Sequence, residues 1–253
     1  MDEKELIRAR LTELDRLAYE RNILKTSGFL SYAEQQAYHQ LQKAGSFLTP
    51  THFLGGGYEE SERAAAFFLP DYMDKAEAEG AKIAVLKAEV PGEKYAEELT
   101  HRDYLGALMN LGIERDRLGD ILTDGPEAYV YCLSEMAQFL CDNLLRVRHS
   151  AVTCTVCEGG ADIRPRFEEL SVNVASERAD CVLAALYKLS RTEAQKLFAA
   201  EKVFSDGRVI TDPGKKLNEE SRVSVRGYGK FIYGGTEGKS RSGRLFVHIR
   251  RFV

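Results

Sequence analysis

The sequence predicts an α+β protein of three domains, and three observations carry this prediction. The chain has 253 residues, more than one compact domain usually holds. Its apolar residues follow helical spacing near the N-terminus and strand-like alternation after residue 82. Residues 1–170 carry 19 basic and 30 acidic side chains, a net charge of −11, whereas residues 171–253 carry 16 and 9, a net charge of +7. We place the domains at residues 1–72, 73–160 and 161–253.

The first domain is predicted to be helical. Its first segment repeats apolar side chains at helical spacing, at Ile7, Leu11, Leu14 and Ala18. Ser31 and Glu34 have the spacing of a capping box, which predicts a second helix ending near Lys43. Pro50 and a run of three glycines then break the pattern. A short third helix is expected over residues 59–68, because acidic residues at its start favour the helix dipole.

The central domain is predicted to be ferredoxin-like, with the element order β-α-β-β-α-β. Strand character is found at residues 82–90, 118–123, 127–133 and 151–157. A helix with Thr100 as its cap is expected over residues 104–111, and Ser134 is expected to cap a second helix that ends near residue 145. This element order is shared by many unrelated domains, so it does not by itself predict a function.

Tyr129 and Tyr131 are candidates for base stacking in this domain. Residues two apart in a strand point to the same face, and aromatic side chains on a sheet face stack on bases in RNA-recognition motifs. The basic-glycine signature of those motifs is absent from the sequence. The alternative interpretation is that both tyrosines pack against a neighbouring domain or helix.

Composition and cysteine spacing exclude several classes of protein. No apolar run approaches the roughly 20 residues that cross a bilayer, and the charged N-terminus does not resemble a secretory signal, so we expect a cytoplasmic protein. Cys154 and Cys157 form a CxxC pair, but no second pair of ligands lies at zinc-site spacing. We interpret both as inert strand residues, and predict no metal, cofactor or catalytic residue.

Residues 161–253 are predicted to form a small αα-β domain. Alternation at Leu170, Val172 and Val174 indicates a strand, and helices are expected over residues 178–187 and 190–200. Ser190 and Glu193 have the spacing of a capping box for the second helix. Strands follow, including residues 222–226, and the Gly-rich tail after Arg226 predicts a hairpin.

This C-terminal segment resembles the RNA-binding domain named after ribosomal protein S-four, the αL motif. The resemblance rests on a set of positions taken together: Arg178, Asp180, Ser190, Arg191, Ala194, Val203, Asp206, Gly207, Val209, Pro213, Leu217, Val223 and Val225. Two positions depart from the pattern, because Glu201 replaces the usual glycine and Ser221 the usual acidic residue.

The basic residues of this segment are the candidate nucleic-acid contacts. Arg191 lies in the first turn of a helix, where backbone amides favour an anion. A groove lined by cations contacts phosphates more than bases and suits structured RNA rather than DNA. The predicted contact residues are Arg178, Ser190, Arg191, Lys196, Lys202, Arg208, Lys215, Lys216, Arg226 and Lys230.

From about Gly56 to its C-terminus, the chain resembles the YlmH family of bacterial and plastid proteins. The resemblance is carried by residues 56–72, by residues 101–122 and by the basic domain in third place. It implies a protein that binds ribosomal RNA or tRNA on the large ribosomal subunit, in the rescue of stalled subunits during ribosome-associated quality control. Two alternatives stay open: an RNA-modifying enzyme of the pseudouridine synthase or methyltransferase type, and a protein-binding adaptor in cell division.

Overall fold

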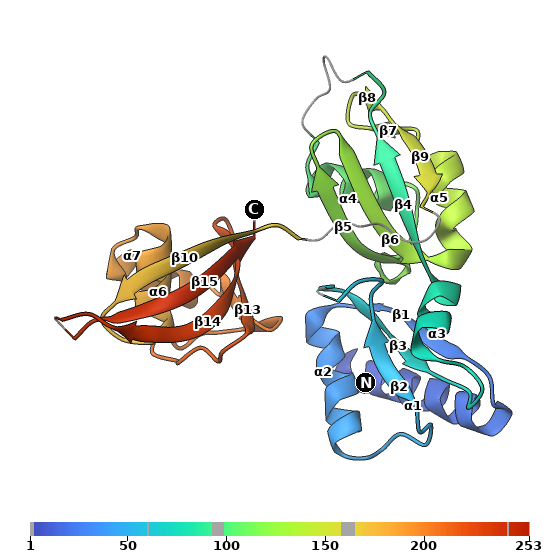
Figure 1. Cartoon of the computed structure of the whole chain (residues 1–253), viewed down its shortest axis with the longest axis horizontal. Helices are drawn as coiled ribbons and strands as arrows, with labels where there is room; N and C mark the ends of the chain where they lie inside the picture. The colour runs from blue at the N-terminus through green and yellow to red at the C-terminus, as the bar shows by residue number, and fades with distance from the viewer. Residues whose placement is uncertain (1–2, 60, 93–98, 158–164, 242, 253) are drawn as a thin grey trace. The chain divides into compact units, whose positions relative to one another are not determined.

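The computed structural model describes residues 3–59, 61–92, 99–157, 165–241 and 243–252 (Figure 1). Helices and strands are mixed along the chain, which confirms the predicted α+β class. The chain divides into two compact units, residues 1–164 and 165–253. The boundary predicted after residue 160 lies outside the described residues. Among the described helices, none is long and apolar enough to cross a membrane.

The first part of the N-terminal unit is not purely helical, so this prediction was wrong. Helices α1 (Glu3–Arg21) and α2 (Tyr32–Lys43) are present, and the capping box of Ser31 and Glu34 is formed. They accompany an antiparallel sheet with the strand order β1-β3-β2. Its strands are β1 (Lys25–Leu30), β2 (His52–Gly55) and β3 (Ala64–Phe68).

Strand β3 replaces the helix that was predicted over residues 59–68. All five of its residues are buried. Phe67 packs into one hydrophobic cluster and Phe68 into another, so both faces of the strand are covered. A short apolar run buried on both faces has no alternation, and periodicity alone therefore does not distinguish it from a helix.

The second part of this unit is a four-stranded antiparallel sheet with the strand order β5-β6-β4-β9. Its elements follow one another in the expected order: β4 (Ile83–Glu89), α4 (His101–Asn110), β5 (Leu118–Asp124), β6 (Glu127–Leu133), α5 (Ala137–Asn143) and β9 (Thr153–Val156). Thr100 is the N-cap of α4, as predicted. Ser134 instead begins a short 3-10 turn, and Met136 is the N-cap of α5. Shorter elements complete this part: α3 (Lys75–Lys82), β7 (Arg146–Val147) and β8 (Ser150–Ala151).

The two sheets of the N-terminal unit pack against each other. Phe29 and Phe67 of the first sheet share a buried cluster with Val85 and Tyr131 of the second. Alternate residues of β6 contact the helices on its other face, with Val130 in the cluster that includes α4 and α5. The central sheet is therefore covered on both faces, by helices on one and by the first sheet on the other.

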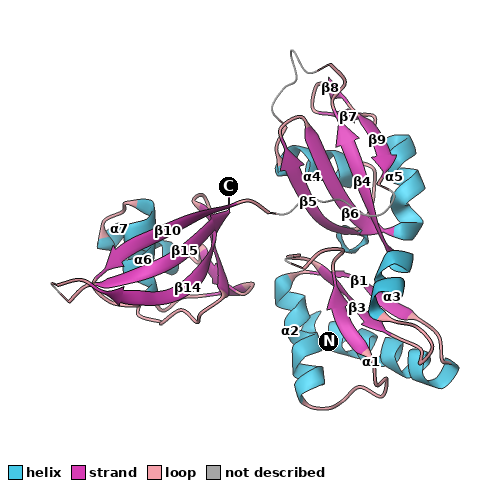
Figure 2. Ribbon diagram, in the orientation of Figure 1, coloured by secondary structure: helices cyan, strands magenta, loops and turns pink. Residues whose placement is uncertain are grey.

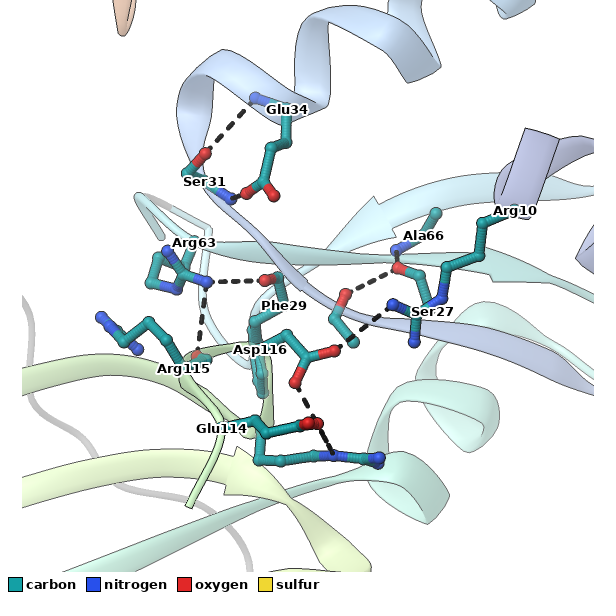
Figure 3. Close-up of polar contacts among 12 residues, drawn as sticks. Arg10, Ser27, Phe29, Ser31, Glu34, Arg63, Ala66, Glu114, Arg115 and Asp116 are labelled. Atoms are coloured by element: carbon teal, nitrogen blue, oxygen red, sulfur yellow. Dashed lines mark hydrogen bonds and ion pairs between the residues drawn. The ribbon is translucent and has the colours of Figure 1, made fainter. Parts of the chain in front are cut away.

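Hydrogen bonds of Arg63 and Asp120 also link segments at the border of this contact between the two sheets. The guanidinium of Arg63 donates to the carbonyl oxygen of Phe29 at 2.6 Å (Figure 3). It also donates to the carbonyl oxygen of Leu118 at 3.1 Å, and so joins the two sheets. The Asp120 carboxylate accepts from the Tyr58 hydroxyl and the Glu62 amide, both at 2.6 Å. Burial lowers the pKa of Arg63. These bonds satisfy partly buried groups, which would be costly to leave unpaired.

The C-terminal unit is a six-stranded antiparallel sheet with the strand order β10-β15-β14-β13-β11-β12. Helices α6 (Ala179–Tyr187) and α7 (Arg191–Ala199) lie together on one face of it (Figure 2). Their apolar sides and the facing strand residues form a single cluster that includes Leu183, Phe198 and Val247. The strands are β10 (Phe167–Val174), β11 (Val203–Ser205), β12 (Arg208–Val209), β13 (Ser221–Val225), β14 (Gly229–Lys239) and β15 (Leu245–Phe252).

Candidate nucleic-acid interface

A buried carboxylate organises the start of both helices in the C-terminal unit. Asp180 has no exposed surface. Arg178 donates to both of its oxygens at 3.0 Å, Gln195 donates to Oδ2 at 3.0 Å, and Arg191 donates from Nε to Oδ2 at 3.3 Å. We call Arg178, Asp180, Arg191 and Gln195 the Asp180 cluster. It connects the first residues of α6 to the first turn and a half of α7.

The electrostatics of this cluster favour two fixed cations. Burial alone would raise the pKa of the Asp180 carboxyl, but the hydrogen bonds from Arg178 and Gln195 outweigh it and hold that pKa well below its ordinary value. The side chains of Arg178 and Arg191 remain 42% and 61% exposed. One negative charge therefore orients two guanidinium groups that still face solvent, which leaves a positive charge available to an anion.

Ser190 acts as a helix cap. Its hydroxyl oxygen accepts from the Glu193 amide at 3.2 Å, while the Glu193 carboxylate accepts from the Ser190 amide at 2.8 Å. This is the predicted capping box, and it satisfies two of the otherwise unpaired groups at the start of α7. The cap fixes the backbone that carries Arg191.

Lys215 and Lys216 lie beside the start of α6. The Lys215 carbonyl oxygen accepts from the Ala179 amide at 2.9 Å, and Arg178 pairs with Lys216 in an isolated β-bridge. The Lys216 ammonium is 2.7 Å from the Glu177 carboxylate, whose hydrogen bond raises the pKa of Lys216. The structure therefore brings Lys215, Lys216 and Arg178 together, although Glu177 offsets one of the charges.

A second group of cations lies on the sheet face that points away from α6 and α7. The Arg226 guanidinium is 4.7 Å from the centre of the Phe204 ring, and the Arg226 amide donates to the Lys202 carbonyl oxygen at 2.9 Å. Ser224 pairs with Phe204 on one side and with Lys230 on the other, so these residues share a face. We call Lys202, Phe204, Arg226 and Lys230 the Phe204 cluster.

The two remaining predicted contacts, Lys196 and Arg208, are exposed on α7 and β12. Eight of the ten predicted residues thus lie at one of two places, the starts of α6 and α7 or the Phe204 cluster.

Tyr131 does not stack on bases, because it has no exposed surface, and this prediction was wrong. Its ring packs 4.9 Å from that of Tyr58, between the two sheets of the N-terminal unit. Tyr129 points to the same face, as predicted, but is only partly buried, and its hydroxyl donates to Glu127 at 2.8 Å. At Tyr131 this face of the strand packs against the first sheet of the N-terminal unit. This agrees with the alternative interpretation, in which the tyrosines pack against a neighbouring part of the protein.

The CxxC pair is split between two environments. Cys154 packs with the helix-side cluster of the central sheet and Cys157 with the cluster between the two sheets. Burial raises the pKa of both thiols, which disfavours the reactive thiolate. Among the described residues, no group of three His, Cys, Asp or Glu side chains is placed to hold a metal ion.

Comparisons with known proteins find similarity to one protein family and one curated relative. Residues 77–159, from α3 to just after β9, match the family model described as "Putative RNA-binding domain in YlmH". A curated relative, "Ribosome-associated protein quality control protein P2" of Bacillus subtilis, is 26% identical over 204 residues, which is 78% of this chain and 77% of the relative. Residues 77–159 are therefore similar to the RNA-binding domain described for the YlmH family.

A solved structure is also similar to this chain. It is the "Cell division protein ylmH from Streptococcus pneumoniae", with 21% sequence identity and a TM-score of 0.48. The similarity covers 62% of this chain and 92% of the solved one. The match to the YlmH family model lies within the N-terminal unit, whereas both cation clusters lie in the C-terminal unit.

Three residues of these clusters were not among the predicted contact residues, and Asp180 was named only as a position of the S-four resemblance. Gln195 faces Asp180 because it lies on the side of α7 that meets α6, and its place between Ala194 and Lys196 in the sequence gave no sign of that contact. Phe204 reads in the sequence as an ordinary strand residue. Its neighbour Arg226 is 22 positions away, so only the pairing of β11 with β13 brings the two together.

Proposed function

We propose that this protein binds structured RNA through its C-terminal unit, and that this unit is an RNA-binding domain of the S-four type. The Asp180 cluster carries the proposal, because a buried carboxylate there fixes two exposed guanidinium groups at the starts of two helices. Arginine held in this way is suited to phosphate, since its planar fork donates several hydrogen bonds at once. The net charge of +7 over residues 171–253 favours the same partner.

We further propose that the RNA is ribosomal RNA or tRNA of the large ribosomal subunit, and that the protein acts in the rescue of stalled subunits in the cytoplasm. The name of the Bacillus subtilis relative, a ribosome-associated quality control protein, supports this proposal. So does the family description of an RNA-binding domain for residues 77–159. The proposed role is binding without catalysis.

Sedimentation with purified ribosomal subunits tests this function. The full chain is centrifuged through sucrose gradients with small subunits, with large subunits, and with large subunits that carry peptidyl-tRNA. We expect it to migrate with large subunits, most strongly when peptidyl-tRNA is present, and crosslinks from residues 165–253 to map to RNA. A protein that stays at the top of every gradient would overturn the ribosomal part of the proposal.

A matched pair of variants connects the result to the Asp180 cluster. Arg178→Gln with Arg191→Gln removes both oriented cations, and should move the protein toward the top of the gradient. Arg21→Gln with Lys43→Gln removes two exposed charges of the N-terminal unit, outside the family match, and should leave the migration unchanged. An equal effect of the two pairs would attribute binding to net charge rather than to the cluster.

A further inference from the structure

A groove lies between strand β10 and helix α6 in the C-terminal unit, and it shares only Arg191 with the Asp180 cluster. Its volume is about 550 Å³, within the range of about 300–1,000 Å³ that small-molecule sites occupy. Strand β10 is the edge strand of its sheet and pairs with β15 on one side only (Figure 1). The groove therefore lies beside an edge strand. Seven of its lining residues matter for what it could bind: Val172, Asn173, Cys181, Ala184, Ala185, Arg191 and Arg244.

The floor of the groove is apolar and made of small side chains. Cys181, Ala184 and Ala185 lie three and four residues apart on α6, so they share one face of that helix, and Val172 faces them from β10. Because alanine is short, the helix and the strand leave a space that larger residues would fill. A flat ring is well suited to such a floor, since it buries both of its faces against apolar atoms.

The guanidinium groups of Arg191 and Arg244 also line the groove, beside this apolar surface. Arg244 donates from Nη2 to the Asn173 carbonyl oxygen at 3.1 Å and from Nε to the Asn173 side chain. Arg191 donates to Asp180 from Nε at 3.3 Å. Each guanidinium has five N–H groups, so the described bonds of both leave donors for a ligand. Within the described part of the chain, none of the residues that line the groove is acidic.

We propose that this groove binds one unstacked nucleotide of an RNA strand. The base packs on Val172, Ala184 and Ala185, and the phosphates on either side of it bind Arg191 and Arg244. This inference rests on the proposed RNA-binding function and adds a site that distinguishes unpaired from paired RNA. A peptide strand added to the edge of β10 would also enter the groove, but two cations at its rim favour an occupant with regularly spaced negative charges.

Binding to two RNA hairpins tests whether the protein distinguishes unpaired from paired RNA. One RNA hairpin is fully paired and the other carries a single-nucleotide bulge, and binding of the full chain to each is measured at the same salt concentration. A base that leaves water and packs on apolar side chains adds affinity that the paired hairpin cannot gain, so we expect the bulged hairpin to bind about fivefold more tightly. Ala185→Leu fills the groove without changing charge, and should abolish the preference while leaving affinity for the paired hairpin.

Ala199→Leu is the matched control, because it makes the same change at an exposed position of α7 and should keep the preference. Alkylation of Cys181, followed by mass spectrometry of the wild-type protein, gives a second measurement that needs no variant. Cys181 lines the groove, so the bulged hairpin should slow its modification more than the paired one.

The outcomes separate this inference from the function on which it rests. Equal binding of both hairpins, with equal modification of Cys181, would overturn the nucleotide site and leave RNA binding intact. The groove would then be open to a peptide segment. Failure to bind either hairpin or the ribosomal subunits would overturn RNA binding itself, and the nucleotide site with it.

Discussion

The Nε atom of Arg191 lies 3.3 Å from Oδ2 of Asp180, a carboxylate that is completely buried while the arginine stays 61% exposed. The same oxygen accepts from Arg178 and Gln195. Asp180 is buried and is also held by Arg178 and Gln195. It therefore restricts the rotamers of Arg191 more than a surface carboxylate would. The exposed end of the arginine is therefore oriented before any RNA arrives, which lowers the entropy cost of binding.

Replacing Asp180 with asparagine should destabilise the C-terminal unit by about 1–3 kcal/mol, because charge-assisted bonds to Arg178 and Arg191 are lost from a buried site. Hydrogen exchange of peptides from residues 165–253 measures the free energy of opening for this unit. Glu237→Gln removes an exposed carboxylate of the same unit, and should change that free energy by less than about 0.5 kcal/mol. Equal effects of the two variants would contradict the role given to Asp180.

The stabilisation from Asp180 should depend on pH in a defined direction. Its pKa in the folded protein lies below the ordinary aspartate value of about 3.9 in the unfolded chain. The ionised group therefore stabilises the fold fully above about pH 5, and this contribution declines as the pH falls below the unfolded value. The difference in free energy of unfolding between wild type and Asp180→Asn should be constant from pH 7 to 5 and shrink toward pH 3. A difference that grows in acid would show the opposite shift.

Arg191→Gln combined with Lys196→Gln should flatten the salt dependence of RNA binding. Each lost phosphate contact reduces the slope of log affinity against log salt by roughly 0.7–0.9, so the pair should reduce it by roughly 1.4–1.8. Affinity for one RNA hairpin, measured across a salt series, gives the slope. The Arg21→Gln and Lys43→Gln pair should leave the slope as it is in wild type. An unchanged slope in the first pair would remove both residues from the interface.

Removing the hydroxyl of Tyr131 should not destabilise the protein. That oxygen is buried and has no hydrogen-bond partner among the described residues, so Tyr131→Phe removes an unpaired polar group. Tyr58→Phe, in the adjacent ring, removes a 2.6 Å bond to Asp120 and should cost about 0.5–1.5 kcal/mol. Urea denaturation of both variants provides the comparison. A larger loss for Tyr131→Phe than for Tyr58→Phe would indicate a partner for the Tyr131 hydroxyl.

Ser190→Ala should lower stability without changing the salt slope. The hydroxyl of Ser190 accepts from the Glu193 amide, and loss of such a cap costs about 0.5–2 kcal/mol. Ser31→Ala removes the same kind of cap from α2 in the N-terminal unit and should cost a similar amount. Thermal denaturation and the salt series together test this. A lower affinity at every salt concentration, beyond the loss that a matched decrease in stability explains, would mean that the hydroxyl contacts RNA directly.

Local patterns were sufficient for most of the central and C-terminal elements. The strand from Glu127 to Leu133 and the capped helix after Ser190 follow from alternation and from a capping box, which depend on neighbours a few residues away. Strand β3 did not follow from such a pattern. It is buried on both faces, so its five apolar residues carry no periodicity that would distinguish strand from helix.

For the candidate site too, some properties follow from the sequence and others only from the tertiary structure. Its cations and their segregation from the acidic part of the chain are properties of the sequence, because charge depends only on residue type. Their grouping depends on contacts between distant residues. Asp180 meets Gln195 only because α6 packs on α7, and Phe204 meets Arg226 only because β11 pairs with β13.

By itself, the sequence determined the α+β class, the positive C-terminal region and the capped start of α7, since each arises from composition or short-range spacing. Tertiary structure alone decided that Tyr131 is buried between two sheets and that Asp180 orients Arg178 and Arg191. The packing of α6 beside β10 also creates the groove between them. The physical reason is that burial and side-chain pairing depend on which elements pack together, and a face-to-face contact leaves no local signature in either partner.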